Sequence, residues 1–270
     1  MNQINAEIEI REEIEISQLT ENKACLELSI NGKLFKGLVN VLNELVDGCE
    51  LLIKENRISF IIVDPAHVAM LEMNIPNKAF SVIRVFDNAD YPRIGIDLDK
   101  FKDILKSVKK DDMLNMSFNA DNINLSFGNV ETKINYIDCS NFSEPKVPNL
   151  NLNGSFSLGV SEFHEAIRQC GIISDHLSIN LDHDNILIKA SNETGQETTI
   201  KHANTSIQEY ARSLFPQDYL KHHYGALKAI DKKAISDIKM GVDYPMQSDT
   251  ILTSDIEIMF LLAPRIENDD

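Results

Sequence analysis

The feature that most constrains the fold of this 270-residue chain is a pattern of amphipathic stretches that occurs four times. These stretches begin near Leu34, Leu98, Ser161 and Asp218, at intervals of 64, 63 and 57 residues. Runs of alternating apolar and polar residues fill the intervals. A repeat of this length corresponds to one supersecondary unit. The pattern therefore predicts four copies of a unit in which a strand, a helix and further strands follow one another.

The second amphipathic stretch shows the helical period most clearly. Its apolar residues Phe101, Ile104, Leu105 and Val108 fall at i, i+3, i+4 and i+7, which is one stripe of a helix. In the other three stretches the residues predicted to be buried are Leu34, Leu38, Val41, Leu42 and Leu45, then Phe163, Ala166, Ile167 and Cys170, then Leu220, Tyr224 and Leu227. Each helix is expected to pack one face on a sheet and to expose a polar face with at least one cation.

Between the amphipathic stretches the period changes to two, which indicates strands. The runs 113–118 and 122–127 flank the turn-forming Asn119-Ala120-Asp121 and predict a hairpin. Further strands are predicted at 57–63, 67–73, 177–181, 185–190 and 235–242. Helices collected on one face of antiparallel sheets give a fold of the α+β class.

Length and composition favour two domains. With 43% hydrophobic residues the chain can form two cores, and four units pair naturally into two similar domains. Pro145 and Pro148 interrupt the strand pattern and predict an exposed connector. The expected organisation is an acidic N-terminal extension (1–22), a first domain (23–138), the connector (139–153) and a second domain (154–270). The alternation of Ile and Glu in the extension favours an added edge strand, with an acidic arm as the alternative.

Cysteine usage and apolar run lengths indicate a soluble intracellular protein. The cysteines Cys25, Cys49, Cys139 and Cys170 form no CxxC pair, which fits a reducing compartment. No apolar run approaches the ~18 residues of a membrane span. The glutamate-rich N-terminus is unlike a signal or transit peptide. No membrane, metal or cofactor is expected.

Motifs of enzyme active sites are incomplete in this chain. His164-Glu165 begins like the zinc-protease motif HExxH, but Arg168 stands where the second histidine belongs. The segment 182–185 resembles the start of a calcium loop, yet it lacks the glycine and the distal glutamate, so a hairpin turn is expected. There is no P-loop, GxGxxG or GxSxG motif. The sequence therefore favours a binding function over an enzyme.

Charge is distributed unevenly along the chain. The net charge of −16 alone argues against nucleic-acid binding, which needs an electropositive surface. The helix windows 33–46, 97–110, 161–174 and 217–230 nevertheless carry +1, +2, −1 and +1, so the rest of the chain carries −19. A solvated helix face explains clustered lysines more often than a ligand does, so charge alone does not settle the function.

Four separated segments resemble the sliding clamps of the proliferating cell nuclear antigen family, in the style of its archaeal members. These segments are RISFIIVDPAHVAMLEM (57–73), RIGIDLDKFKDILKSVKKDD (93–112), SEPKVPNLNL (143–152) and FLLAPRIE (260–267). The resemblance covers nearly the whole chain from Lys23 onward. It implies a DNA-clamp fold in which the two domains of each subunit are similar and three subunits close into a ring around duplex DNA. The expected function is that of a DNA polymerase processivity factor in replication.

The resemblance also implies two sets of site residues. The residues expected to face DNA are Lys33, Lys36, Lys102, Lys106, Lys109, Lys110, Arg168, Lys221 and Lys228. The third helix is expected to contribute least, because Glu165 stands near a position that is often basic in the family. A pocket under the connector, which would receive partner peptides of the QxxLxxFF kind, is expected to contain Val63, His67, Val68, Met70, Val147, Pro148, Pro245, Leu261, Ala263 and Pro264.

The implied partners are duplex DNA without sequence preference, DNA polymerase, a clamp loader and other proteins with a peptide motif. Ring closure is expected to pair the edge strands TKINYID (132–138) and GQETTIKH (195–202) of neighbouring subunits. A homotrimer is expected, with a heterotrimer as the alternative. A checkpoint clamp or a viral processivity factor remains an alternative role. The expected location is the cytoplasm for an archaeal source and the nucleus for a eukaryotic one.

Overall fold

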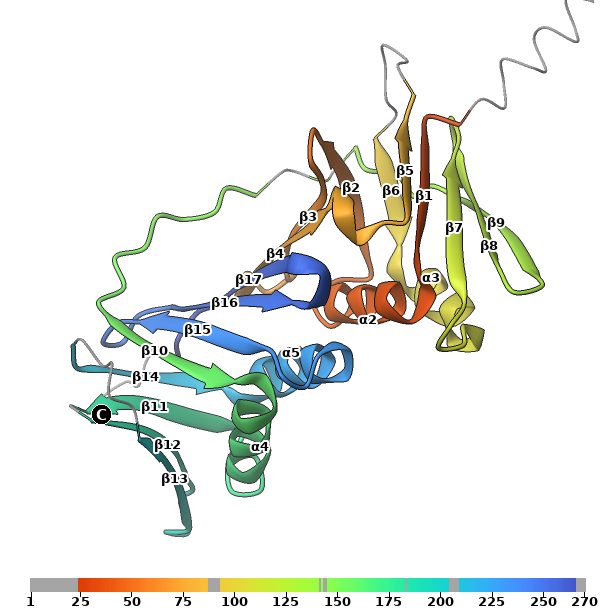
Figure 1. Cartoon of the computed structure of the whole chain (residues 1–270). Helices are drawn as coiled ribbons and strands as arrows, with labels where there is room; N and C mark the ends of the chain where they lie inside the picture. The colour runs from red at the N-terminus through yellow and green to blue at the C-terminus, as the bar shows by residue number, and fades with distance from the viewer. Residues whose placement is uncertain are drawn as a thin grey trace, which may run out of the picture.

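The computed structural model describes residues 24–86, 93–140, 142, 145–182, 184–203 and 209–265, so the extension 1–22 and its predicted strand or arm lie outside the described residues. Each α-helix of the described chain begins at the residue after a strand ends (Figure 1). These strand and helix pairs are β1 (Leu26–Asn31) and α2 (Gly32–Asn43), β6 (Ile94–Asp97) and α3 (Leu98–Ile104), β10 (Gly154–Gly159) and α4 (Val160–Cys170), and β14 (Ala211–Pro216) and α5 (Gln217–Ile230). The predicted fourfold repeat is confirmed.

Further antiparallel strands follow each helix, as the α+β prediction requires. In the first half they are β2 (Gly48–Lys54), β3 (Arg57–Val63), β4 (Ala69–Pro76), β5 (Val82–Val85), β7 (Met113–Phe118), β8 (Asn122–Phe127) and β9 (Val130–Asn135). In the second half they are β11 (His176–Asp182), β12 (Asn185–Ser191), β13 (Glu197–Ala203), β15 (Ile235–Met240), β16 (Met246–Leu252) and β17 (Ile256–Leu262). Short 3-10 turns occupy Asn77–Ala79, Leu105–Ser107 and Thr253–Asp255.

One sheet runs through both halves of the chain. Its strand order is β10-β15-β16-β17-β4-β3-β2-β6, and the two halves meet where β17 pairs with β4, with Leu261 opposite Met70 and Leu262 opposite Ala69. Two smaller sheets flank it, with the orders β5-β1-β7-β8-β9 and β13-β12-β11-β14. Strands β9 and β13 therefore lie at sheet edges.

The four helices form one continuous row on the same side of the sheets (Figure 1). In this row α3 packs against α2, α2 packs against α5, and α5 packs against α4. Aromatic contacts support two of these junctions: Phe35 meets Phe101 at a ring distance of 6.3 Å, and Phe163 meets Tyr224 at 4.6 Å. None of the helices in the described ranges is long and apolar enough to cross a membrane.

Local sequence signals explain where two of the helices begin. The Asn31 side chain accepts a hydrogen bond from the Leu34 amide at 3.0 Å, and Asp97 accepts one from the Lys100 amide at 3.0 Å. Such N-caps satisfy amides that lack a partner in the first helical turn. Helix α2 buries Leu38 and Leu42 of the stripe that the sequence predicts, and α3 with the turn after it buries Phe101 and Leu105.

The structure corrects the predicted extent of the second amphipathic stretch. Helix α3 ends at Ile104 and continues as the 3-10 turn Leu105–Ser107. Because the tighter winding changes the angle between successive side chains, Ile104 and Val108 are half-buried and leave the central stripe. In α2 the predicted Leu34 and Leu45 are also half-buried, whereas Phe35 and Val39 lie in the core.

Several predicted strands have different ends in the structure, and in three of them the local contacts explain the difference. The run 67–73 becomes a strand only at Ala69, because Asp64 holds the preceding residues in a turn. The run 132–138 stops at Asn135, after which Ile137 donates to the Gly95 carbonyl of β6 at 3.1 Å. A side chain on Gly95 would place its Cβ 2.2 Å from the Ile137 oxygen, so this crossing requires glycine. The run 195–202 begins two residues late, since Gly195 belongs to a turn.

Candidate nucleic-acid and partner-binding surfaces

The nine residues predicted to face DNA all lie on the helical row or directly after it. Lys33 and Lys36 are on α2, Lys102 is on α3, Lys106 is in the following 3-10 turn, Lys109 and Lys110 come after that turn, Arg168 is on α4, and Lys221 and Lys228 are on α5. Their side chains are exposed or half-buried. The structure therefore brings these cations from distant parts of the sequence onto one helical layer.

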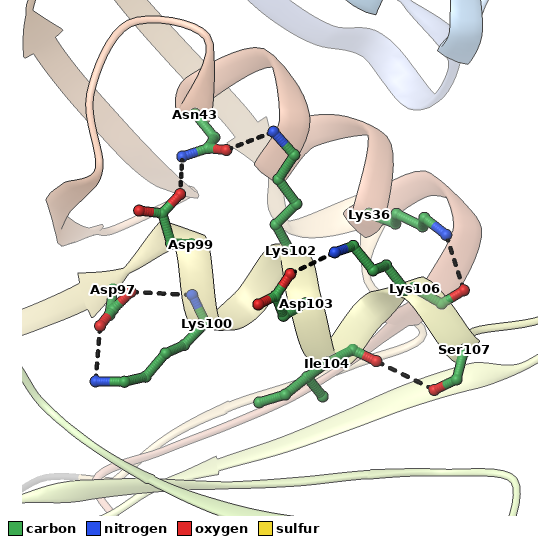
Figure 2. Close-up of polar contacts among 10 residues, drawn as sticks. All are labelled: Lys36, Asn43, Asp97, Asp99, Lys100, Lys102, Asp103, Ile104, Lys106 and Ser107. Atoms are coloured by element: carbon green, nitrogen blue, oxygen red, sulfur yellow. Dashed lines mark hydrogen bonds and ion pairs between the residues drawn. The ribbon is translucent and has the colours of Figure 1, made fainter.

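A polar network joins the exposed sides of α2 and α3 (Figure 2). The Lys102 ammonium donates to the Asn43 side-chain oxygen at 2.8 Å, and the Asn43 amide donates to Asp99 at 3.1 Å. Lys36 donates to the Lys106 carbonyl at 3.2 Å, while the Lys106 ammonium pairs with Asp103 at 2.6 Å. The network fixes three of the predicted cations, but only Lys106 meets a carboxylate.

Ion pairing separates the predicted cations into two groups. Lys106 and Arg168 are the two with a carboxylate partner in the described chain, and both pairs are exposed. Exposed pairs of this kind contribute little to stability. The side chains of Lys33, Lys109, Lys110 and Lys221 form neither an ion pair nor a hydrogen bond within the described residues. These four charges are available to a ligand.

Helix α4 differs from the other helices in its local charge balance. Glu165 accepts hydrogen bonds from Arg168 at 2.8 and 3.1 Å and from Gln169 at 2.9 Å. These bonds lower the pKa of Glu165 to about 2, so the carboxylate stays charged. Glu165 is the reason why this helix is expected to contribute least to DNA contact. In the structure its carboxylate pairs with Arg168 and neutralises the charge of that cation.

His164 lies at the contact between α4 and α5, and the sequence did not predict it as part of this surface. Its Nδ1 lies 3.4 Å from the Lys228 ammonium. Burial, followed by the nearby positive charge of Lys228, lowers the pKa of His164. A neutral imidazole accepts a hydrogen bond from the ammonium, which leaves the charge of Lys228 available.

The chemistry of this layer suits a polyanion with regular charges. Lysine is a flexible point charge that contacts phosphate without reading bases. Seven of the nine cations lack a carboxylate partner in the described chain, and they lie on α2, α3 and α5 or just after the 3-10 turn that follows α3. The helical layer could therefore hold a nucleic-acid backbone at several points without sequence preference.

A second candidate site lies where the connector passes the first half of the chain. A hollow of about 230 Å³ is lined by residues of β2 and β3, by Val63 and His67, and by Phe142 and Pro145 of the connector. Val63 and His67 belong to the predicted peptide pocket. Phe142 and Pro145 are additional members that the sequence prediction did not include.

Other predicted pocket residues meet at the junction of the two halves. Met70 pairs with Leu261, and the Ala263 amide donates to the Val68 carbonyl at 2.9 Å. Met70 and Leu261 are largely buried, whereas Val68, Ala263 and Pro264 are half-buried. Pro245 precedes β16, whose first residue pairs with Leu262 of the same junction. Val147 and Pro148 stay exposed on the connector, and their role in the pocket remains a prediction.

An arginine anchors the start of the connector. Arg93 donates to Glu50 through its Nε at 2.8 Å and to the Phe142 carbonyl through its Nη2 at 2.8 Å. A planar guanidinium is well suited to bridge a carboxylate and a carbonyl in this way. Neither Arg93 nor Glu50 stands out in the sequence, because their contact joins positions 43 and 49 residues apart.

The edge strands β9 and β13 present free backbone amides. In an antiparallel pair, successive amides of an edge strand point alternately toward the neighbouring strand and away from it. The Tyr136 amide donates to the Asp121 carbonyl and the Asn192 amide donates to the Gln196 carbonyl, so these bonds show which amides point inward. Amides of Lys133 in β9 and Thr199 in β13 therefore point away from their own sheets. Their pairing between subunits remains a prediction.

Asp64 is the buried carboxylate of the turn that leads to His67, and its hydrogen bonds predict a stability that depends on pH. Burial works to raise the pKa of Asp64, but bonds from Ala69, Tyr219, Val68 and Ala66 outweigh it and lower the pKa. A group with a depressed pKa in the folded state stabilises the fold above its unfolded pKa, and this contribution disappears as pH falls. Asp64→Asn should lower the unfolding free energy by about 1–3 kcal/mol at pH 7.

The difference between the wild type and Asp64→Asn should shrink as pH falls from about 5 to below the unfolded pKa of ~3.9. Urea unfolding at several pH values measures it, and the other carboxylates cancel because both proteins contain them. A difference that stays constant from pH 7 to pH 3 would contradict the assignment.

Comparisons with known proteins agree with this architecture. Residues 25–142 match the family model described as "Proliferating cell nuclear antigen, N-terminal domain". A protein of Methanocella arvoryzae named "DNA polymerase sliding clamp" is 31% identical over 249 residues, covering 89% of this chain and 98% of the relative. The protein of the same name from Methanosarcina barkeri is 32% identical over 248 residues, with the same coverage.

Solved structures give the same result at the level of the fold. The structure titled "C-terminal region of FEN-1 bound to A. fulgidus PCNA" superposes with a TM-score of 0.80 at 28% identity, covering 90% of this chain and 100% of that one. The fold of the clamp from Thermococcus kodakaraensis matches with a TM-score of 0.78 at 20% identity, covering 89% and 100%.

Proposed function

This chain belongs to the proliferating cell nuclear antigen family and is a DNA polymerase sliding clamp, and we propose that three copies close into a ring around duplex DNA. The helical row would line the hole of this ring, and the sheets would form its outer surface. The clamp would tether a polymerase and other factors to DNA. We propose no catalytic role for the chain, because holding a partner on DNA requires binding surfaces alone.

The observation that carries the DNA-binding part of this proposal is the charge of the helical layer. In a chain of net charge −16, four lysines without any side-chain partner in the described residues lie on or beside helices of one row. An acidic exterior would repel DNA from the outer surface and direct it to the hole. Contacts to phosphate alone would permit sliding, since they carry no sequence information.

Primer extension with a cognate clamp loader and polymerase tests this function directly. On a long primed template, with an excess of unprimed DNA to trap released polymerase, the clamp should lengthen the products of a single binding event. Omission of the loader provides the control on circular template. Product lengths that do not change when clamp and loader are added would refute the proposal.

We further propose that partner proteins insert a short hydrophobic peptide into the site between the connector and the β4–β17 junction. The hollow beside His67 and the half-buried Ala263 and Pro264 support this assignment. The A. fulgidus relative is described in complex with the C-terminal region of FEN-1, a segment of a partner protein. Aromatic anchors in an apolar groove would give affinity from a small contact area.

Ala263→Asp should weaken the binding of a QxxLxxFF-type peptide at least ~10-fold, because a carboxylate would have to lose water against aromatic anchors. Fluorescence anisotropy of a labelled peptide measures the dissociation constant. Ile235→Asp is a matched control, since Ile235 is 59% exposed on β15 and gains the same charge. Equal affinities of the two variants would contradict the proposed peptide site.

A further inference from the structure

The turn between β3 and β4 is built around one buried side chain. Asp64 is 4% exposed, and its Oδ1 accepts hydrogen bonds from the amides of Val68 at 2.7 Å and Ala69 at 2.6 Å. Its Oδ2 accepts one from the Ala66 amide at 3.1 Å. The backbone of His67 adopts a left-handed conformation, with φ of 56°. One carboxylate therefore fixes the conformation of the residues that border the proposed peptide site.

A residue from the other half of the chain completes this arrangement. The Tyr219 hydroxyl, from the first turn of α5, donates to Asp64 Oδ2 at 2.8 Å across 155 residues of sequence. Burial, followed by the hydrogen bond to Asp64, raises the pKa of Tyr219 to about 12, so the hydroxyl keeps its proton at neutral pH. The turn of the first half is thus tied directly to a helix of the second half.

The packing around this hydrogen bond is incomplete. Asp64, Pro65 and Tyr219 line a hollow of about 200 Å³ between the turn and the helices α2 and α5. A hollow provides fewer packing contacts to hold the turn in place. The bond from Tyr219 is the hydrogen bond that the second half of the chain provides to the Asp64 carboxylate, beside those from the turn's own amides.

We propose that Tyr219 is a positioning residue of the partner-peptide site, which it does not itself line. Its hydroxyl orients Asp64, Asp64 sets the turn, and the turn places His67 at the hollow and the Val68 carbonyl against the Ala263 amide. The inference rests on the proposed peptide site. It adds that the affinity of this site depends on a helix that carries two of the DNA-facing lysines, Lys221 and Lys228.

Tyr219→Phe tests the proposal, because it removes the hydroxyl and keeps the ring. Peptide affinity of the full-length clamp should fall by about three- to tenfold, the range expected for one lost hydrogen bond. Amide hydrogen exchange of Val68 and Ala69 should become faster in the same variant without peptide. Tyr136→Phe is the matched control, since the Tyr136 hydroxyl also donates a hydrogen bond, to the Asn119 carbonyl at 2.7 Å and not to the Asp64 turn.

The possible outcomes separate the two proposals. Equal peptide affinity of the wild type and Tyr219→Phe would overturn the positioning role while leaving the peptide site intact. An equal loss in Tyr219→Phe and Tyr136→Phe would also overturn it, because general destabilisation would then explain the effect. A wild-type clamp that binds no QxxLxxFF-type peptide would instead refute the peptide site, and the positioning role with it.

Discussion

Replacing Thr199 with proline is expected to convert the proposed ring of three subunits into single chains of 30.5 kDa. The amide of Thr199 points away from β12 and is free to pair with a neighbouring subunit. Proline removes this donor without removing a bond of the internal ladder, because only outward amides are lost. A monomer cannot encircle DNA, so loader-dependent primer extension should fall to the level without clamp. Light scattering at micromolar concentration measures the mass.

A proline at Val85 provides the matched control. Val85 lies on the edge strand β5, and the Phe86 amide donates to Cys25, so the Val85 amide points away from the sheet. β5 takes no part in the proposed ring contact. If Val85→Pro dissociated the ring as completely as Thr199→Pro, strand β13 would lose its assigned role.

The complementary edge allows a sharper test of ring geometry. Lys133→Pro removes an outward amide of β9, and it should also give monomers. A mixture of the two variants retains one intact β9 and one intact β13 edge, so a head-to-tail interface predicts heterodimers and no larger species. Trimers in that mixture would contradict the β9–β13 pairing, whereas a wild-type chain that is monomeric alone would indicate a heteromeric ring.

The second large effect is expected from removing three lysines that have no partner in the described chain. Lys33, Lys109 and Lys221 lie on α2, after the 3-10 turn and on α5, and their replacement by alanine should leave the fold intact. Each lost phosphate contact makes the plot of log affinity against log salt less steep by about 0.9. Between 50 and 200 mM salt, the affinity of the variant should therefore fall about threefold less than that of the wild type. Three contacts per subunit predict at least ~10-fold weaker equilibrium binding to linear duplex DNA at moderate salt.

Equilibrium binding of the clamp to linear duplex DNA, measured over a salt series, checks this prediction. Alanine at Arg57, Lys146 and Lys189 removes the same charge from exposed positions outside the α-helices that also have no carboxylate partner in the described chain, and is the matched control. Lys106→Ala is less suitable, because it would also release the Asp103 carboxylate. Equal salt slopes of both triple variants would contradict the assignment of the helical layer to DNA.

The hydrophobic pattern predicted the repeat well but missed several strands, and β16 shows the reason. In this strand Ser248 and Thr250 are buried, while Ile251 is 62% exposed. The buried hydroxyls are satisfied by Tyr224 at 2.6 Å and by Ser236 at 2.7 Å. A prediction that places polar residues in solvent and apolar residues in the core would therefore bury the wrong face of this strand.

The candidate sites show a similar division. Lysines on helix faces were predictable, since their spacing follows the helical period. Which of them are held by neutral groups of another segment was not, because Lys102 meets Asn43 and Lys36 meets the Lys106 carbonyl across distant parts of the sequence. In the peptide site, the turn at Asp64 and the anchor at Arg93 likewise depend on residues brought together by the fold.

The sequence by itself determined the four strand-and-helix units, because periodicity, caps and turn residues act over a few positions. The tertiary structure decided the pairing of β17 with β4, the order of helices in the row, the free edges of β9 and β13, and the bond from Tyr219 to Asp64. These features join residues far apart in the chain. Their geometry is set by how the units pack together, and no local pattern contains that information.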